Sequence, residues 1–102
     1  METFSELKRR MLIERGYKCE ACGMPSNDLQ AHHWLWHRLR GHPELDCEYN
    51  CGLVCRSCHM GGVVNSYASR KAFFAVQCKR YGDSVMQHWY DSVPLKSKQR
   101  FL

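Results

Sequence analysis

Four cysteines in two Cys-x-x-Cys pairs are the side chains of this chain best suited to bind a metal ion. The first pair is Cys19 and Cys22, and the second is Cys55 and Cys58. Thiolate sulfur is a soft donor, and four thiolates match the tetrahedral coordination of structural zinc. The two pairs, here called the four-cysteine cluster, therefore predict one bound zinc ion. The alternative is that the four thiols are buried without a metal ion.

Three histidines lie beside these pairs and are surplus to a zinc ion that already has four sulfur ligands. The doublet His32-His33 falls between the pairs, and His59 directly follows Cys58. Neighbouring side chains of a strand face opposite ways, so one histidine of the doublet could bind a metal ion while the other faces a water molecule beside it. We therefore expect a second, chemically active centre. The alternative is that one or two of these histidines complete the zinc site or only pack.

A small α+β arrangement is expected to position these residues. A capping box formed by Thr3 and Glu6 marks the start of a first helix, and Gly16 is a natural stop for it. The Gly61-Gly62 pair predicts that the helix carrying His59 is short or interrupted. The expected elements are a helix over 3–15, strands over 29–34 and 49–54 that pair as a hairpin, a helix from residue 56, a helix over 69–81, and a helix capped by Asp83 or Ser84 that ends before Pro94.

The net charge of +5 comes from clusters of basic residues. Clustered cations are typical of a surface that binds phosphates, although a solvated surface is the alternative. The residues expected to contact nucleic acid are Arg38, Arg40, Arg70 and Lys71, together with a basic tail over 96–102. Lys8, Arg9 and Arg15 fall opposite the apolar face of the first helix, so we expect them to form its basic exterior.

Length and composition indicate a single small domain. A chain of 102 residues buries a limited core, for which a metal ion commonly compensates. Seven cysteines are an odd number for a disulfide framework, which favours metal binding in a reducing compartment. No apolar run approaches the roughly 20 residues that span a bilayer, and residues 1–6 lack the pattern of a signal peptide. We therefore expect a cytoplasmic protein without membrane contact; the sequence indicates no oligomeric state.

The order of these motifs resembles that of the HNH endonuclease family. Cys-x-x-Cys-Gly is followed by His-His, then by Asn50, and five residues after Asn50 by Cys-x-x-Cys-His. More narrowly, the chain looks like the small phage and bacterial members, in which a four-cysteine zinc lies beside a ββα-metal active site. The match spans roughly 15–59. We therefore expect one HNH domain over 1–102 with a core at about 15–68. The resemblance does not reach the C-terminal third, where the sequence pattern alone predicts a helical extension over 69–95 and the tail 96–102.

The resemblance also implies a role for each residue of the second centre. His33 would be the general base, and Asn50 would tie the loop between the strands so that His33 is aimed correctly. His32 and His59 would bind one catalytic divalent cation. Two imidazoles favour manganese, nickel, cobalt or zinc, and magnesium stays possible because it keeps most of its waters. The implied reaction is hydrolysis of DNA phosphodiester bonds. We also expect a hydrogen bond from the other ring nitrogen of His33 to a backbone carbonyl, which would fix its tautomer.

Two departures from the family pattern keep rival functions open. Val63 stands where many members supply a further metal ligand, and Gly61-Gly62 interrupts the helix after His59. One rival is therefore a zinc-stapled module that binds nucleic acid or protein with an unused nuclease-like site. A second rival is a structure-selective nuclease, which a four-way junction compared with linear duplex would reveal.

Other residues of the loop and strands allow further interpretations. His37, His42, Cys47 and Cys51 are spaced so that they could hold a second structural zinc, although the intervening loop is long and acidic. Trp34 and Trp36 could stack on nucleic-acid bases, but we favour a place in the core for both. Cys78 is expected to pack within a helix.

Overall fold

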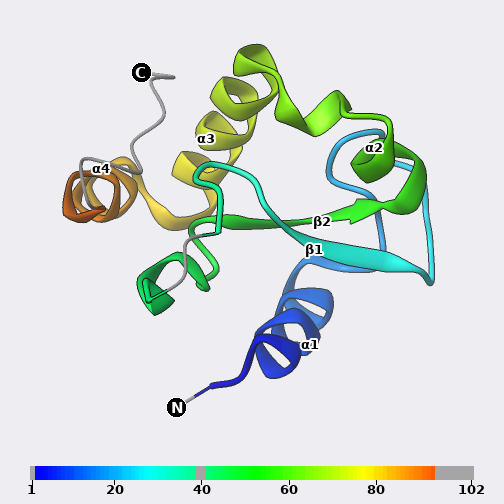
Figure 1. Cartoon of the computed structure of the whole chain (residues 1–102), viewed down its shortest axis with the longest axis horizontal. Helices are drawn as coiled ribbons and strands as arrows, with labels where there is room; N and C mark the ends of the chain where they lie inside the picture. Colours follow the sequence, from blue (N-terminus) through cyan, green and yellow to red (C-terminus); the bar gives the residue numbers. More distant parts are fainter. Residues whose placement is uncertain (1, 39–40, 94–102) are drawn as a thin grey trace.

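The computed structural model describes residues 2–38 and 41–93 and has a small α+β fold. These residues form four α-helices and one two-stranded antiparallel sheet (Figure 1). The α+β class expected from the sequence is therefore confirmed. Arg40 and the basic tail 96–102, both expected to contact nucleic acid, lie outside the described residues.

The sheet is the hairpin that carries the histidine doublet. Strand β1 spans Leu29–His33, and strand β2 spans Cys51–Cys55. Their antiparallel register places His32 opposite Gly52. The pairing of these two strands is as expected, but β2 begins two residues later than the sequence pattern indicated, because residues 49–50 belong to the turn that precedes it.

Helix α1 (Phe4–Arg15) begins and ends as its sequence indicated. The side chain of Thr3 accepts from the Glu6 amide at 3.1 Å, and the Glu6 carboxylate accepts from the Thr3 amide at 2.9 Å. The helix stops at Gly16, whose φ of 86° lies in the region that favours glycine. One face of α1 is buried against the core.

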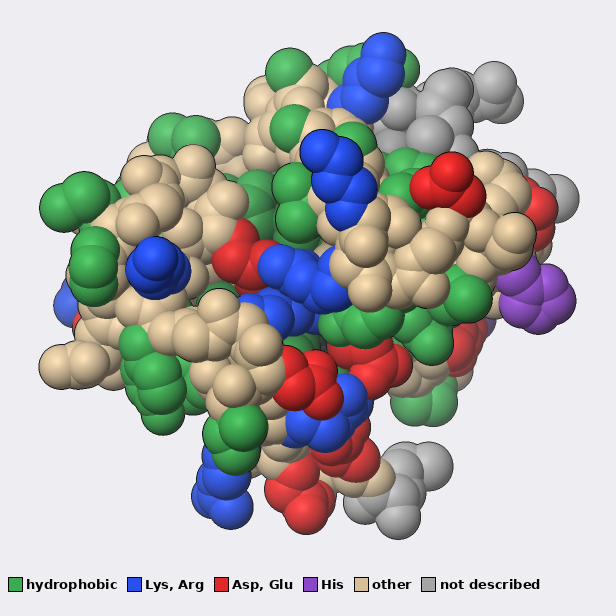
Figure 2. Space-filling model, turned by 180° about the vertical axis from the view of Figure 1, so that it is seen from behind, with side chains coloured by type: hydrophobic (Ala, Val, Ile, Leu, Met, Phe, Trp, Pro, Cys, Tyr) green, Lys and Arg blue, Asp and Glu red, His purple; other side chains and the backbone are tan. Residues whose placement is uncertain are grey.

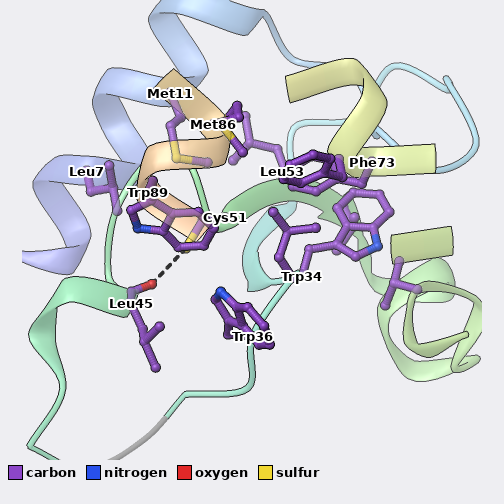
Figure 3. Packing of buried hydrophobic residues seen from close by; sticks show 14 of the residues in the cluster. Leu7, Met11, Trp34, Trp36, Leu45, Cys51, Leu53, Phe73, Met86 and Trp89 are labelled. Carbon is purple, nitrogen blue, oxygen red and sulfur yellow. Dashed lines mark hydrogen bonds between the residues drawn. The ribbon is translucent and has the colours of Figure 1, made fainter. Parts of the chain in front are cut away.

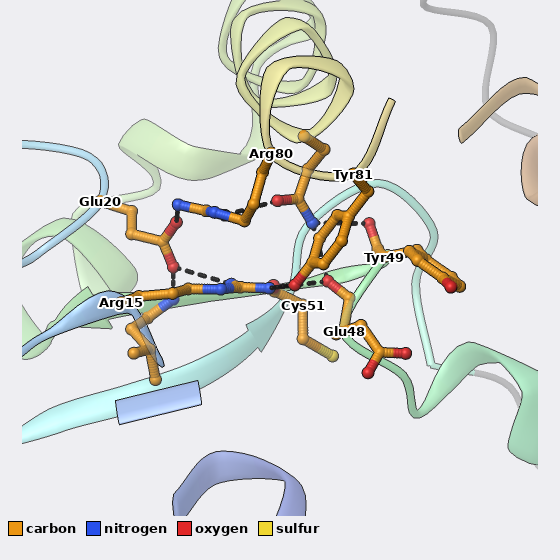
Figure 4. A network of polar contacts seen from close by, with 9 residues as sticks. Arg15, Glu20, Glu48, Tyr49, Cys51, Arg80 and Tyr81 are labelled. Carbon is orange, nitrogen blue, oxygen red and sulfur yellow. Dashed lines mark hydrogen bonds and ion pairs between the residues drawn. The ribbon is translucent and has the colours of Figure 1, made fainter. Parts of the chain in front are cut away.

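Arg15 lies in the interior and not on the basic exterior expected for it. Only 3% of its side chain is exposed. Its guanidinium donates to the Glu20 carboxylate at 3.0 Å and to the carbonyl oxygens of Cys51 and Glu48 at 2.8 and 2.9 Å (Figure 4). It also donates to the Tyr81 hydroxyl at 2.8 Å. Arg15 therefore joins α1 to the start of β2 and to the last residue of α3.

Glu20 covers the edge of β2 that does not pair with β1. The Glu20 amide donates to the Leu53 carbonyl at 2.7 Å, and the Leu53 amide donates to the Glu20 carboxylate at 2.6 Å. An uncovered strand edge exposes unpaired backbone groups that can pair with another chain. The turn that contains Cys19 and Cys22 is therefore attached directly to the sheet.

The remaining helical elements lie between the two strands or after them along the chain. They are the 3-10 turn η1 (Pro43–Leu45) before β2, then α2 (Arg56–Met60), the 3-10 turn η2 (Val63–Asn65), α3 (Tyr67–Tyr81) and α4 (Asp83–Ser92). Helix α2 is short, as the double glycine indicated, and Gly62 adopts a left-handed φ of 74°. The expected side-chain cap of α4 is wrong: Gly82 takes the N-cap position, and Asp83 is the first helical residue. No helix of the described residues is both long and apolar enough to cross a bilayer.

Two tryptophans from the segment after β1 lie at the centre of the core (Figure 3). Trp34 is 5% exposed and stacks on Phe73 of α3 with ring centroids 4.2 Å apart, and Trp36 is fully buried. Both tryptophans therefore pack in the core, as we favoured. Gly52 makes this stacking possible, since a Cβ there would lie 2.4 Å from a Trp34 ring carbon. The core thus holds the strand end next to the histidine doublet in place.

Candidate metal centres

The four-cysteine cluster is assembled by the fold. The Sγ atoms of Cys19, Cys22, Cys55 and Cys58 all lie within 4.8 Å of one another. Four thiolates at about 2.3 Å from a tetrahedral zinc ion have sulfur atoms about 3.8 Å apart. The Cys22 and Cys55 sulfurs, 3.9 Å apart, match this spacing. These side chains could therefore hold a structural metal ion such as zinc.

The backbone around the first pair is folded into a tight turn towards the sulfurs. The Gly23 amide donates to the Cys19 carbonyl at 2.8 Å, and the Cys22 amide points at the Cys19 sulfur from 3.4 Å. The second pair spans the end of β2 and the first turn of α2. A metal ion in the cluster would therefore tie this turn to the strand–helix junction that carries His59.

The thiols of the cluster differ in acidity. Burial raises the pKa of Cys19, but amide donors from Cys55, Cys22 and Ala21 outweigh it and bring the pKa down to about 6. The neighbouring Cys55 thiol, burial and the other two sulfurs raise the pKa of Cys58 to about 12. Four crowded thiols cannot all ionise without a cation between them, so binding of a divalent metal would release protons.

His32 and His59 lie side by side at the second centre. Their ring centroids are 4.9 Å apart, although the residues come from β1 and α2. The Nδ1 atom of His59 is hydrogen-bonded to the Gln30 amide oxygen. The other ring nitrogen, Nε2, takes no part in this hydrogen bond. Burial lowers the pKa of His32 to about 4, with smaller effects from His59, His33 and His37. Two imidazoles this close could share one divalent cation.

His33 lines the same side of the molecule as this pair and has a carboxylate partner. Its Nε2 atom lies 2.6 Å from an oxygen of Asp46. Its ring stacks on Phe4, with centroids 5.0 Å apart and planes 8° apart. We expected a backbone carbonyl to fix the His33 tautomer, whereas the structure has the Asp46 side chain in contact with this ring.

Asn50 is fully buried and connects the two ends of the loop between the strands. Its Oδ1 atom accepts from the amides of Leu35 and Trp36 at 3.1 and 2.7 Å. Its Nδ2 atom donates to the carbonyls of Trp36 and Leu45 at 3.1 and 2.9 Å. All four bonds are internal, so Asn50 fixes the path of the chain on either side of the loop.

The three histidines open into one hollow. A depression of about 330 Å³ is lined by His32, His33 and His59 together with His37 and Arg38. Phe4 and Ala31 complete its lining, and no acidic residue of the described chain is part of it. The hollow is therefore suited to an anionic group next to the histidines.

Arg70 and Lys71, which were also expected to contact nucleic acid, do not line this hollow. Arg70 and Lys71 lie in the first turns of α3, and Arg70 donates to the Asn65 carbonyl. The face in Figure 2 mixes Lys and Arg with Asp and Glu side chains and has no continuous basic patch. Among the described residues, Arg38 is therefore the arginine or lysine that lines the hollow together with the histidines.

The residues considered for a second structural zinc are not gathered. Within residues 2–38 and 41–93, the four-cysteine cluster is the one group of three or more such ligands close enough for a metal ion. His42 pairs with Glu44 at 2.7 Å. Cys51 is fully buried, and burial raises the pKa values of both Cys51 and Cys47, the latter to about 11.

Two residues of the second centre were missed by sequence reasoning. Asp46 contacts His33, and Gln30 contacts His59. Gln30 lies in β1, where an alternating pattern places it on the same face as His32. That pattern could have identified Gln30. Asp46 is one of several acidic residues in the loop, and nothing in the sequence sets it apart.

Comparison of the chain with protein-family models, with curated proteins and with solved structures gives no match. Function is therefore inferred from the geometry of the two centres.

Proposed function

We propose that this chain is a metal-dependent HNH endonuclease that hydrolyses DNA phosphodiester bonds. The observation that carries the proposal is the contact between His32 of β1 and His59 of α2, whose ring centroids are 4.9 Å apart. His33 lines the same hollow. A strand pair followed by a helix brings together the histidines that the family pattern assigns to the active site. The adjacent four-cysteine cluster is the structural zinc site of this proposal.

Three histidines of the hollow take part in the proposed reaction, and Arg38 and Asn50 support them. His32 and His59 bind the catalytic cation, which supplies charge stabilisation at the phosphate and at the leaving oxygen. His33 takes a proton from the attacking water, since imidazole titrates near neutral pH. Arg38 attracts the phosphate into the hollow, and Asn50 keeps the loop in the shape that aims His33.

A binding module without catalysis is the second candidate. The observation that favours it is Val63, which is 59% exposed at the position where many family members supply a further metal ligand. A metal ion in the four-cysteine cluster alone would stabilise the fold of such a module. DNA or a protein would then bind without being cut.

Plasmid cleavage distinguishes the two functions. The zinc-loaded protein is incubated with supercoiled plasmid and manganese, with and without a chelator that leaves the cluster zinc in place. We expect relaxed or linear plasmid in the presence of manganese alone. His33→Ala should cut about 100-fold more slowly or worse, the usual contribution of a positioned general base. His88→Ala, which changes an exposed histidine of α4, should cut normally. Intact plasmid at every metal concentration would favour the binding module.

A further inference from the structure

The hydrogen bond between His33 and Asp46 determines which ring nitrogen of His33 carries a proton. An ionised carboxylate only accepts hydrogen bonds. The Nε2 atom, 2.6 Å from the Asp46 oxygen, must therefore be the donor in this pair. In a neutral imidazole the other nitrogen, Nδ1, is then an acceptor with a free lone pair.

Two contacts together hold the His33 ring in one orientation. The stacked Phe4 ring, 5.0 Å away, fixes its plane. Asp46 fixes its rotation within that plane, and only 13% of the His33 side chain is exposed. A ring held by a flat neighbour and a carboxylate keeps one orientation, and Nδ1 is the nitrogen that is not bonded to Asp46.

Asp46 is itself held by the residues around it. Its amide donates to the Pro43 carbonyl at 2.9 Å, which ends the 3-10 turn η1. The carbonyl of the preceding residue, Leu45, accepts from the buried Asn50 side chain at 2.9 Å. Asn50 therefore acts on His33 through the backbone at Leu45 and the side chain of Asp46.

We propose that Asp46 is the positioning residue of His33, holding a proton on Nε2 and leaving Nδ1 as the atom that accepts the proton of the attacking water. This inference rests on the nuclease function proposed above. As Nδ1 takes the proton, the water oxygen bonds to phosphorus. The electron pair of the bond from phosphorus to the 3′ oxygen leaves with that oxygen, which is protonated by solvent.

The same loop contains a matched control. His42 and Glu44 form a histidine–carboxylate pair with a 2.7 Å contact, and neither residue lines the hollow. Asp46→Ala and Glu44→Ala therefore each remove one carboxylate from one histidine. The two variants separate the effect at His33 from a general effect on the loop.

The first arm of the test is nitrogen-15 NMR of histidine-labelled, zinc-loaded protein without a second metal. His33→Ala identifies the His33 signals. In the parent we expect a protonated Nε2 whose hydrogen exchanges slowly, and an unprotonated Nδ1. In Asp46→Ala this hydrogen should exchange with water too fast to be seen, whereas in Glu44→Ala it should persist. A proton on Nδ1 in the parent would overturn the inference.

The second arm is the rate of plasmid cleavage with manganese. Asp46→Ala should lower kcat by about 10- to 100-fold, the usual effect of removing a group that orients a site histidine, with KM unchanged. Glu44→Ala should match the parent. Normal cleavage by Asp46→Ala overturns the role of Asp46 alone. Absence of cleavage by the parent overturns the nuclease proposal together with the role of Asp46 in it.

Discussion

Replacement of Arg15 by methionine should destabilise the protein by about 3–5 kcal/mol, the range found when one partner of a buried ion pair is removed. Its guanidinium is 3% exposed and makes four hydrogen bonds. Methionine keeps much of the length of the side chain but none of its donors. The Cys51 carbonyl and the Tyr81 hydroxyl would each be left without this buried partner.

Part of the destabilisation is compensated, which favours the lower end of that range. Glu20 keeps its contact with Arg80 at 3.0 Å and with the Leu53 amide. The Glu48 carbonyl keeps its bond from Gln77 at 2.7 Å. We therefore expect a destabilisation nearer to about 3 than to about 5 kcal/mol.

Arg10→Met is the matched control in the same helix. Arg10 is 37% exposed and pairs with Glu2 and Glu48 at the surface. Exposed pairs contribute at most about 1 kcal/mol. Urea unfolding of zinc-saturated protein, followed by circular dichroism, should give a midpoint for Arg15→Met at least about 1 M below that of Arg10→Met. Equal midpoints would refute the account of a fold joined through Arg15.

Three further outcomes follow from the two centres and the tail. Cys58→Ser should unfold the domain, because binding of structural zinc contributes on the order of 10 kcal/mol coupled to folding. The control Cys78→Ser should stay folded. If Cys58→Ser without zinc melted at the wild-type temperature, the structural role of the zinc would be contradicted. The pKa of His32, near 4 when folded and about 6.5 when unfolded, means that the unfolded chain binds more protons between these values. Stability should therefore fall as pH drops from about 6.5 to 4, by on the order of 1–2 kcal/mol after solvent screening, and less in His32→Gln; equal pH profiles from chemical unfolding would exclude this contribution. Removal of 96–102 should weaken DNA binding. It should also reduce the slope of log K against log salt concentration by about one unit for each phosphate that the tail neutralises. An unchanged slope would show that the tail does not contact DNA.

Local sequence signals predicted the elements that position the candidate site. The capping box at Thr3, the stop at Gly16 and the double glycine after His59 each act within a few residues. Their effects can therefore be read from the local sequence alone. The assembly of the four-cysteine cluster followed from the spacing of its two pairs and from the chemistry of thiolates. The α+β class could be predicted for the same reasons.

Contacts between distant segments could not be predicted in this way. A helical pattern places Arg15 opposite the apolar face, but three of its four acceptors come from β2, from the loop before β2 and from α3, up to 66 residues away. The partner of His33 lies 13 residues further along the chain, and its position depends on the loop that Asn50 ties. Such contacts are set by the packed structure and leave no periodic signal.

In the function proposed here, His32 and His59 bind the catalytic cation while His33 acts as the base. The most direct test is the rate of plasmid cleavage as a function of manganese concentration for the parent, His33→Ala and His59→Ala. His59→Ala should need more manganese and regain part of its activity at high concentration, whereas His33→Ala should stay slow at every concentration. Rescue of His33→Ala by manganese, with none for His59→Ala, would reverse the two roles, and full activity in both variants would contradict the nuclease site.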